Sequence, residues 1–312
     1  MINESNFFLQ TTKRHDLNEL STNSSVELEL KSIFDTFKNN MSEVIYVVQS
    51  YFNIMAHAKT QEACNKIFER NRILAYADSL RGSYENDHAR INQAASERAK
   101  ADIDKGELDN YSILDGVIIT LNDLEKDPVI ELSNKSTMRQ GIVIIWSSIE
   151  TLIRDIIRVK LNLDYELASN FFESSETNSY WQKKQISFEH LKRYNFDLKN
   201  HFGDVALDIN SCSNLSAIKT AFAYVMGKNS LSYQNLASKN FYNLYKLRNI
   251  IAHKNGIVDD KYKSEVSCTE SVGEKVNITS TTFNNCFFTA KDLAINIKNE
   301  ITGKSVKYDN HL

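Results

Sequence analysis

The sequence is poor in residues that interrupt helices or build special sites. Its 312 residues include one proline and nine glycines, so few positions force the chain out of a helix. The four cysteines form no C-x-x-C pair and have no histidine at ligand spacing; they are Cys64, Cys212, Cys268 and Cys286. This spacing argues against a zinc site and predicts free thiols in a reducing compartment.

Excess charge and long apolar runs are also missing. Lys and Arg number 37 against 40 Asp and Glu, for a net charge of -3, which excludes a protein that holds nucleic acid by bulk positive charge. The most apolar run, residues 142–146, is too short to cross a bilayer, and the first residues lack the pattern of a signal peptide. We therefore expect a cytoplasmic protein with no membrane contact.

Catalytic motifs of several common classes are absent. The sequence contains no glycine-rich phosphate loop, no G-x-S-x-G and no H-E-x-x-H. Any chemistry must therefore come from another arrangement of side chains.

Helical periodicity is what the sequence does have. Apolar residues recur every three or four positions in many segments, which predicts an all-α helical bundle. The expected helices cover about 30–55, 60–81, 86–104, 108–124, 137–161, 215–225, 234–255 and 289–301. At most one short β element is expected, near 275–280.

The N-terminal helices show the clearest patterns. Ser24 to Glu27 fit a capping box, and the stripe that follows it begins at Leu30 and runs to Met55. In the second helix the inward stripe is expected to be Ala63, Ile67, Leu74, Ala77 and Leu80. Arg81 and His88 form an arginine–histidine pairing with six residues between them. We assign no functional role to this pairing because Gly82 and its neighbours interrupt the helix between the two residues.

A domain boundary is predicted near Pro128. The residue before a proline is disfavoured in helical space, and residues 133–136 are polar. We expect residues 1–128 to form an N-terminal helical region with a regulatory, sensing or dimerising role. Residues 129–312 then form a second helical domain, with a long insertion at about 164–235 whose aromatic side chains either pack or stack on bases, packing being favoured.

The segment around Arg248 concentrates polar chemistry on one helix. At about 100° per residue, Arg248, Asn249 and His253 share one face, while Leu244, Leu247 and Ile251 share the other. Gly256 follows at the point where a helix commonly ends in a left-handed residue. One short stretch therefore packs on a core and also presents a guanidinium, an amide and an imidazole.

The spacing Arg248-Asn249-x-x-x-His253 resembles the R-φ-x-x-x-H signature of the HEPN superfamily. The residues that follow, 254–259, are similar to those of the branch tied to RNA-cleaving toxins and phage defence. The resemblance implies a HEPN-like helical bundle and an endoribonuclease of toxin or abortive-infection type. It also implies a homodimer in which two signature helices face each other, with Arg248, Asn249 and His253 as catalytic residues.

Supporting residues are expected around this trio. Glu150, which follows Trp146, resembles the acidic residue that related HEPN proteins carry on the adjoining helix, although a pair between Glu150 and Arg154 explains it equally well. The predicted RNA-binding residues are Lys246, Lys254, Asn255 and Lys261. Lys263 belongs to the same basic patch, and possible additions to it are Lys183, Lys184, Lys192 and Arg193. An ordinary solvated helix end is the alternative explanation of these lysines.

The trio suits RNA cleavage without a metal or a cofactor. RNA supplies the 2′-hydroxyl nucleophile, so cleavage needs a base, an acid and positive charge on the phosphorane. His253 can be the base or the acid because imidazole groups in general titrate near neutrality, Arg248 can hold two phosphate oxygens, and Asn249 can orient the imidazole or contact the ribose. A partner subunit would supply a second imidazole.

Two other functions stay open. One is a non-catalytic HEPN-like protein that binds a nucleotidyltransferase antitoxin or another defence component, with Tyr262 and the other tyrosines near the signature as residues that such an enzyme can modify. The other is a catalytically silent scaffold, which the complete set of Arg248, Asn249 and His253 disfavours.

Overall fold

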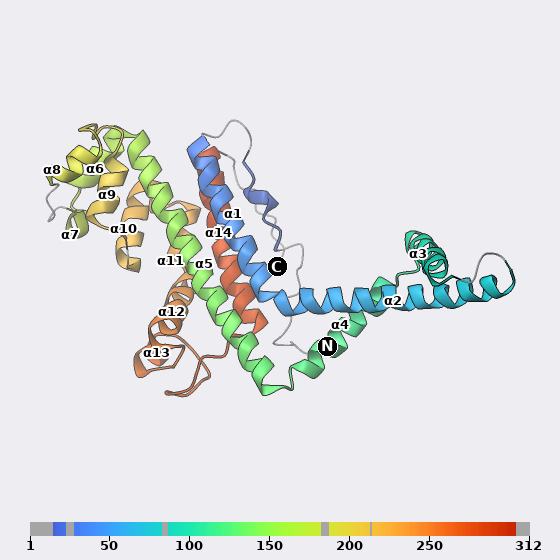
Figure 1. The fold of residues 1–312 in the computed structure, drawn as a ribbon. Helices are drawn as coiled ribbons and strands as arrows, with labels where there is room; N and C mark the ends of the chain where they lie inside the picture. Colours follow the sequence, from blue (N-terminus) through green and yellow to red (C-terminus); the bar gives the residue numbers. More distant parts are fainter. Residues whose placement is uncertain (1–14, 23–27, 83–86, 182–186, 213, 304–312) are drawn as a thin grey trace. The chain divides into compact units, whose positions relative to one another are not determined.

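All regular structure in the described residues is helical. The computed structural model describes residues 15–22, 28–82, 87–181, 187–212 and 214–303. The predicted all-α class is therefore confirmed (Figure 1). The one β contact in the described ranges is an isolated antiparallel bridge between Ile257 and Lys275, in keeping with at most a short β element near 275–280.

The helices of the described residues follow one another along the chain, and residues 266–279 form the connection between the last two. In chain order they are α1 (Leu28–Val48), α2 (Ser50–Leu80), α3 (His88–Asp104), α4 (Asn110–Leu124), α5 (Pro128–Leu163), α6 (Tyr165–Glu173), α7 (Asn178–Trp181), α8 (Phe188–Arg193), α9 (Phe202–Ile209), α10 (Leu215–Met226), α11 (Leu231–Ala237), α12 (Lys239–Lys254), α13 (Asp260–Glu265) and α14 (Ser280–Thr302). A short 3-10 turn, Asn18–Leu20, precedes α1.

The described chain divides into two compact units. The first unit covers Val48–Asn134 and the second covers residues 15–47 together with the described part of 135–312. This division differs from the expected regions 1–128 and 129–312, because residues 28–47 of α1 belong to the second unit. The difference has a simple cause: the α1 side chains Phe34, Phe37 and Met41 are almost fully buried.

The first unit consists of α2 with α3 and α4 packed against it. The stripe predicted for α2 is partly wrong: Leu74 and Leu80 are 50% and 64% exposed, while Asn71, Ala75 and Ser79 are buried. Small side chains on the contact face let another helix approach closely. Packing with α3 has therefore selected the face with the smaller side chains.

Helix boundaries in the N-terminal half differ from those predicted. The break lies at Gln49, between α1 and α2, and α2 then continues without interruption to Leu80. The expected gap near residue 58 is therefore wrong. Neither proline nor glycine marks Gln49, so no local signal was available. The predicted capping box of Ser24 to Glu27 lies outside the described residues.

Pro128 begins a helix instead of separating two domains. It is the first residue of α5, and the Asp127 Oδ1 accepts hydrogen bonds from the Val129 and Ile130 amides at 2.8 and 3.3 Å. Proline suits this position because the first helical amide needs no intrahelical partner. Residues 133–136 are helical, so the chain is not interrupted there, but the division between the two units falls within this stretch, between Asn134 and Lys135. The apolar stripe predicted further along α5 is confirmed by buried Ile142, Ile145, Ile149, Leu152, Ile153, Ile156 and Val159.

The second unit packs its C-terminal helices around α14. Helices α11 and α12 both contact α14, and α10 contacts α11. Helix α5 meets α12 through Trp146, whose ring lies 5.4 Å from that of Phe241 and 5.1 Å from that of Tyr245. The N-terminal turn is held to α14 because the Lys298 Nζ donates to the backbone oxygens of Glu19 and Ser21.

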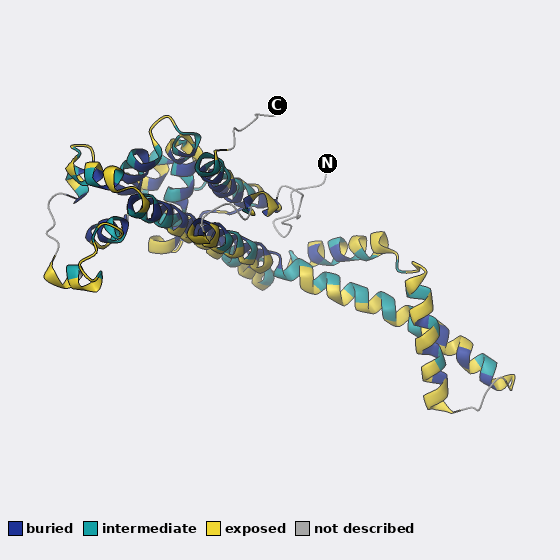
Figure 2. Cartoon of the chain, turned by 90° about the horizontal axis from the view of Figure 1, so that it is seen from above, coloured by how far each residue is buried: buried dark blue, intermediate teal, exposed yellow. Residues whose placement is uncertain are grey.

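The segment predicted as an insertion contains α6 to α11. Its aromatic side chains divide into two groups: Phe171 and Trp181 are buried, whereas Phe188 and Phe196 are exposed and contact each other. Packing is therefore the role of the first pair. Figure 2 shows the corresponding burial along the ribbon.

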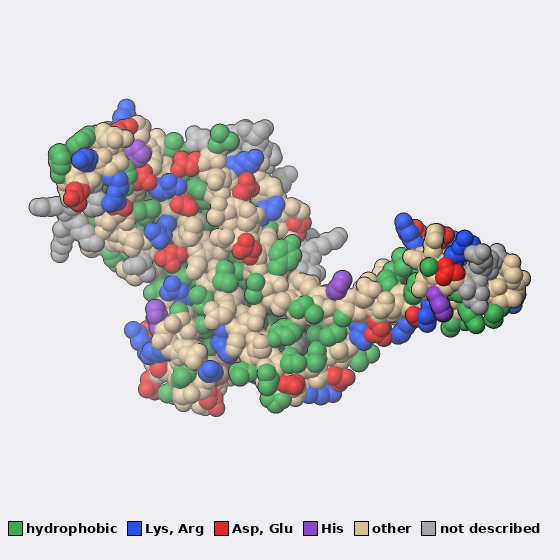
Figure 3. Space-filling model, in the orientation of Figure 1, with side chains coloured by type: hydrophobic (Ala, Val, Ile, Leu, Met, Phe, Trp, Pro, Cys, Tyr) green, Lys and Arg blue, Asp and Glu red, His purple; other side chains and the backbone are tan. Residues whose placement is uncertain are grey.

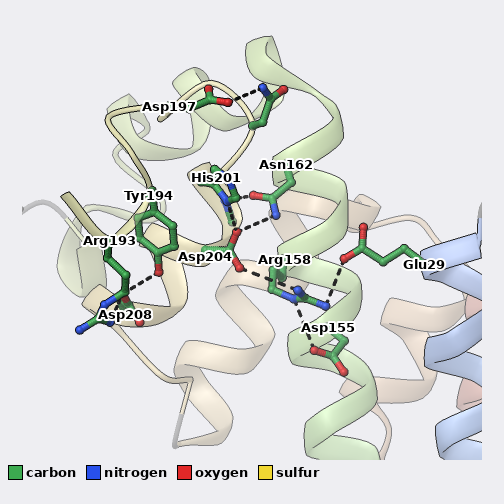
Figure 4. A network of polar contacts seen from close by, with 12 residues as sticks. Glu29, Asp155, Arg158, Asn162, Arg193, Tyr194, Asp197, His201, Asp204 and Asp208 are labelled. Carbon is green, nitrogen blue, oxygen red and sulfur yellow. Dashed lines mark hydrogen bonds and ion pairs between the residues drawn. The ribbon is translucent and has the colours of Figure 1, made fainter. Parts of the chain in front are cut away.

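A polar network holds α9 against α5 (Figure 4). The Asn162 side chain accepts a hydrogen bond from the Gly203 amide at 2.7 Å and donates one to Asp204 at 3.0 Å. Arg158 lies 3.8 Å from Asp204 and 3.3 Å from Glu29, so it links α9 and α1 to α5. The carboxylate of Asp204 also contacts the His201 ring at 2.9 Å. This His–Asp pair is thus part of a helix junction.

No helix within the described ranges has the length and apolarity needed to cross a membrane.

Candidate functional site

The signature segment lies on α12, which is shorter than predicted. The helix expected over 234–255 is divided at Ser238, whose side chain accepts a hydrogen bond from the Phe241 amide at 3.2 Å and starts α12. At the other end Gly256 has φ +76°, and its amide donates to the Ile250 carbonyl at 2.9 Å. The predicted left-handed glycine is confirmed, and Asn255 before it is left-handed as well.

The two faces of α12 are as the spacing predicted. Leu244, Leu247 and Ile251 are buried. Arg248 and Asn249 are half-buried and His253 is exposed. The helix therefore anchors on an apolar face and turns its polar trio away from that face.

Arg248 is held by its neighbours on α12 and α5. Its Nη1 donates to the Asn249 Oδ1 at 2.9 Å, its Nη2 lies 3.9 Å from the Glu150 Oε2, and its guanidinium carbon lies 6.0 Å from the Trp146 ring centre. The Arg248 Nε is buried and has no hydrogen-bond acceptor in the described structure. The Nη1 of Arg248 is therefore bonded to Asn249, and the Nε of the same guanidinium remains without an acceptor.

The position of Glu150 distinguishes its two interpretations. The Oε2 of Glu150 accepts a hydrogen bond from the Trp146 Nε1 at 3.1 Å and is the same atom that lies near Arg248. Within the described residues no ion pair joins Glu150 to Arg154. The carboxylate therefore sits beside the signature helix and faces Arg248.

His253 and Asn249 line one cavity of about 260 Å³. Ile250 contributes the apolar part of its wall, and Tyr262 closes it from α13. No hydrogen bond or ion pair joins His253 to another described residue, so its imidazole is available to a ligand. We call this space the His253 cavity. Arg248 is not among its lining residues, and it is connected to the cavity through Asn249.

Three predicted RNA-binding lysines, Lys246, Lys254 and Lys261, also line the His253 cavity. Two of them already have carboxylate partners. Lys246 pairs with Glu265, and Lys254 pairs with Asp259. The Lys254 ammonium and the Tyr262 amide together hold the pKa of Asp259 below its usual value. The mixture of charges over α12 and α13 is visible in Figure 3.

The remaining basic candidates lie elsewhere. Asn255 does not line the cavity and serves as the left-handed end of α12. Arg193 pairs with Asp208 at 3.1 Å, and Lys263 donates to the Glu270 carbonyl at 2.9 Å. Lys183 and Lys184 lie outside the described residues.

Sequence reasoning missed the acidic side of the cavity. Asp259 could have been noticed as the cap of α13, because its side chain accepts from the Tyr262 amide three residues later at 2.7 Å. Its pairing with Lys254, and that of Glu265 with Lys246, carry no sequence signal. Asp259 and Glu265 offset the charges of Lys254 and Lys246, so the cavity is less positive than its lysines alone would make it.

The arrangement offers general acid–base chemistry next to cationic groups. A phosphodiester in the His253 cavity would meet an imidazole, an amide, the ammonium group of Lys261, and the two ammonium groups that are paired with Glu265 and Asp259. In the described ranges no cluster of three or more His, Cys, Asp or Glu side chains is placed to hold a metal ion.

Comparison with known proteins finds no matching family model, and neither a curated protein nor a solved structure matches the chain.

Proposed function

We propose that this protein is an RNA endonuclease that uses Arg248, Asn249 and His253 without a metal ion or cofactor, and that it acts as a toxin or abortive-infection effector in bacterial defence. The observation that carries the proposal is the grouping of an unpaired imidazole with an amide and three lysines in the His253 cavity. The R-N-x-x-x-H spacing that resembles the HEPN signature supports it.

In the proposed reaction the 2′-hydroxyl attacks the adjacent phosphorus while His253 takes its proton or protonates the leaving 5′-oxygen. Either step requires an accessible ring nitrogen near neutral pH, and His253 is exposed. The products would be a 2′,3′-cyclic phosphate and a 5′-hydroxyl.

Arg248 and Asn249 act as a connected pair in this mechanism. The Arg248 Nη1 holds the Asn249 Oδ1, which leaves the amide nitrogen of Asn249 to donate to the ribose or the imidazole. Arg248 does not itself line the His253 cavity, so in this mechanism its positive charge acts on the phosphorane through the Asn249 amide that it holds. Glu150 keeps the guanidinium oriented from 3.9 Å away.

A second imidazole would make the acid–base cycle complete. His253 lies in the last turn of α12, which ends in exposed residues. A homodimer that brings two such helix ends together would place one histidine as base and the other as acid. In such a dimer a subunit without His253 removes one of the two imidazoles, so adding excess His253→Ala protein to the wild type should reduce cleavage by forming mixed dimers.

The alternative function is a non-catalytic partner of a nucleotidyltransferase antitoxin. Its site of modification would be Tyr262 or another tyrosine near the signature. The Tyr262 side chain is only 6% exposed and lies in the cavity wall, which disfavours modification of Tyr262 itself.

The test is incubation of the purified chain with single-stranded RNA, with and without EDTA. We expect cleavage in both conditions, a loss of about 100-fold or more in His253→Ala, and a loss of similar size in Arg248→Ala. Matched controls are His57→Ala and Arg72→Ala, which remove the same side-chain types from the exposed surface of α2. Equal cleavage by His253→Ala and the wild type would refute the assignment.

A further inference from the structure

A second and larger cavity adjoins the His253 cavity. Its volume is about 440 Å³, and it is formed by α12, α14 and the segment that connects α13 to α14. Tyr262 lines both cavities. Four asparagines line the larger one, Asn240, Asn243, Asn277 and Asn285. We call it the asparagine cavity.

The asparagine cavity differs from its neighbour in charge. No lysine, arginine or histidine lines it, and its one acidic residue is Glu270. The Glu270 carboxylate is already used, since it accepts from the Asn277 amide at 2.9 Å and from the Thr269 hydroxyl at 3.4 Å. Without positive charge the cavity does not suit a phosphate group.

Three of the four asparagines, Asn240, Asn277 and Asn285, are exposed and can bond to solvent, whereas Asn243 is half-buried. No hydrogen bond joins the side-chain amides of Asn240, Asn243, Asn277 or Asn285 to another described residue. The Oδ1 of Asn243 is buried and has no donor in the described structure. Because a buried acceptor without a partner is unfavourable, this atom points to a ligand that donates a hydrogen bond.

The apolar part of the wall suits a flat ring. Leu244 and Leu247 contribute from α12 and Val276 from the connecting segment. A cavity of a few hundred Å³ with an apolar wall and a few convergent polar groups is typical of a small-molecule site. An uncharged ring with adjacent donors and acceptors on its edge matches both features.

We propose that the asparagine cavity binds an unstacked nucleobase of the RNA strand whose phosphate occupies the His253 cavity. This inference rests on the proposed function and assigns it a base-recognition subsite. An asparagine amide pairs with a base edge through one donor and one acceptor, and adenine offers this combination at N6 and N7. Proteins that read single-stranded RNA commonly take up splayed bases in this way.

The shared Tyr262 explains why the two cavities act on one strand. The His253 cavity receives the backbone, and the asparagine cavity, which has no cationic side chain and lies on the same tyrosine, receives a base attached to it. Adenine in that position should therefore set the preferred cleavage site.

Binding measured without cleavage tests the proposal. The probes are free adenosine, free uridine and a fluorescent 2′-O-methyl adenylate hexamer, which has no 2′-hydroxyl nucleophile. We expect the wild-type chain to bind adenosine more tightly than uridine. Asn243→Ala and Asn285→Ala should each weaken adenine binding about fivefold or more. Asn53→Ala, on the exposed surface of α2, is the matched control and should bind as the wild type does.

The outcomes separate the two proposals. Weakened binding of the hexamer alone would identify a base within a strand as the ligand, and weakened binding of adenosine as well would extend this to the free nucleoside. Unchanged affinity in both asparagine variants would overturn the base subsite, whatever the cleavage assay shows. If His253→Ala loses cleavage but the asparagine variants keep their preference for adenine, the protein is a nuclease that lacks this base subsite. Since Asn285 is exposed, its variant is expected to stay folded, which thermal unfolding will verify.

Discussion

The two compact units differ in the size of the side chains that they bury. In the second unit the largest fully buried side chains are aromatic, among them Trp146, Trp181 and Phe283, while the largest in the first unit is Leu121. The first unit has two small clusters, one around Val117 and Leu121 and one around Ala75, Ile91 and Ala95. It therefore removes much less apolar surface from water.

Polar contacts take a larger part in the first unit. Arg70 pairs with Asp102 and Glu107, and the Asn71 side chain donates to Asp102 at 2.8 Å. Exposed ion pairs of this kind add little stability. Large apolar side chains such as Ile73 and Tyr111 also stay exposed there, and green side chains are visible on the surface of this unit in Figure 3.

The comparison teaches where a precise site can be built. Catalytic groups need neighbours that fix their rotamers, and a well-packed aromatic core supplies such neighbours. Trp146 shows the connection, because one side chain packs on Phe241, donates to Glu150 and lies beside Arg248. Both cavities lie in the second unit.

The largest expected effect separates the two cores. Phe283→Ala should destabilise the second unit by about 3–5 kcal/mol, because it leaves a cavity among fully buried side chains. Leu121→Ala should destabilise the first unit by about 2 kcal/mol, the low end for such a change, because its partners Tyr51, Phe52 and Met55 are partly exposed and can rearrange. Hydrogen exchange under mild denaturant measures each unit separately. Equal loss of protection in both units with either variant would show that they unfold together.

Smaller effects, opposite in sign to each other, are expected when two helical glycines are replaced by alanine. In the second unit, a Cβ on Gly203 would lie 2.0 Å from the Arg158 carbonyl oxygen, so Gly203→Ala should cost about 1–3 kcal/mol. In the first unit, a Cβ on Gly116 would meet only the flexible Lys59 side chain at 3.6 Å. Gly116→Ala should therefore stabilise α4 by about 0.5–1 kcal/mol. Urea unfolding measures both changes, and a stabilising Gly203→Ala would contradict the close contact of α9 with α5.

The effect that is smallest near neutral pH concerns the cysteines, and it grows as the pH rises. Burial raises the pKa of Cys212 and of Cys286 to about 12. In the unfolded chain both thiols titrate near 9, so the folded state holds their protons longer. Their contribution to stability is complete below pH 9 and is lost as the pH rises toward 12.

Alkylation at pH 8 measures this difference. Cys64 in the first unit and Cys268 in the second are partly accessible and should react with iodoacetamide. Cys212 and Cys286 should react only after the second unit unfolds. Peptide mass mapping identifies the modified positions, and early modification of Cys286 would show that the core around α14 opens more readily than its burial implies.

Much of the helical fold could be predicted from apolar spacing. The stripes of α1 and α5 were predictable because long aliphatic and aromatic residues at helical intervals have one favourable arrangement. The stripe of α2 was not, because its apolar residues occur on several sides of the helix and only contact with α3 selects the face of Ala75 and Ser79. The break at Gln49 likewise had no local signal.

For the candidate site, the sequence by itself determined which side chains share a face of α12. Helix geometry sets the directions of Arg248, Asn249 and His253, and Gly256 sets the helix end. Both features can be predicted from local sequence without reference to distant residues. Only the tertiary structure decided what faces them. Glu150 arrives from α5, and the carboxylates beside Lys246 and Lys254 arrive from α13 and its cap. Such contacts depend on how separate helices pack, which spacing along one helix does not encode.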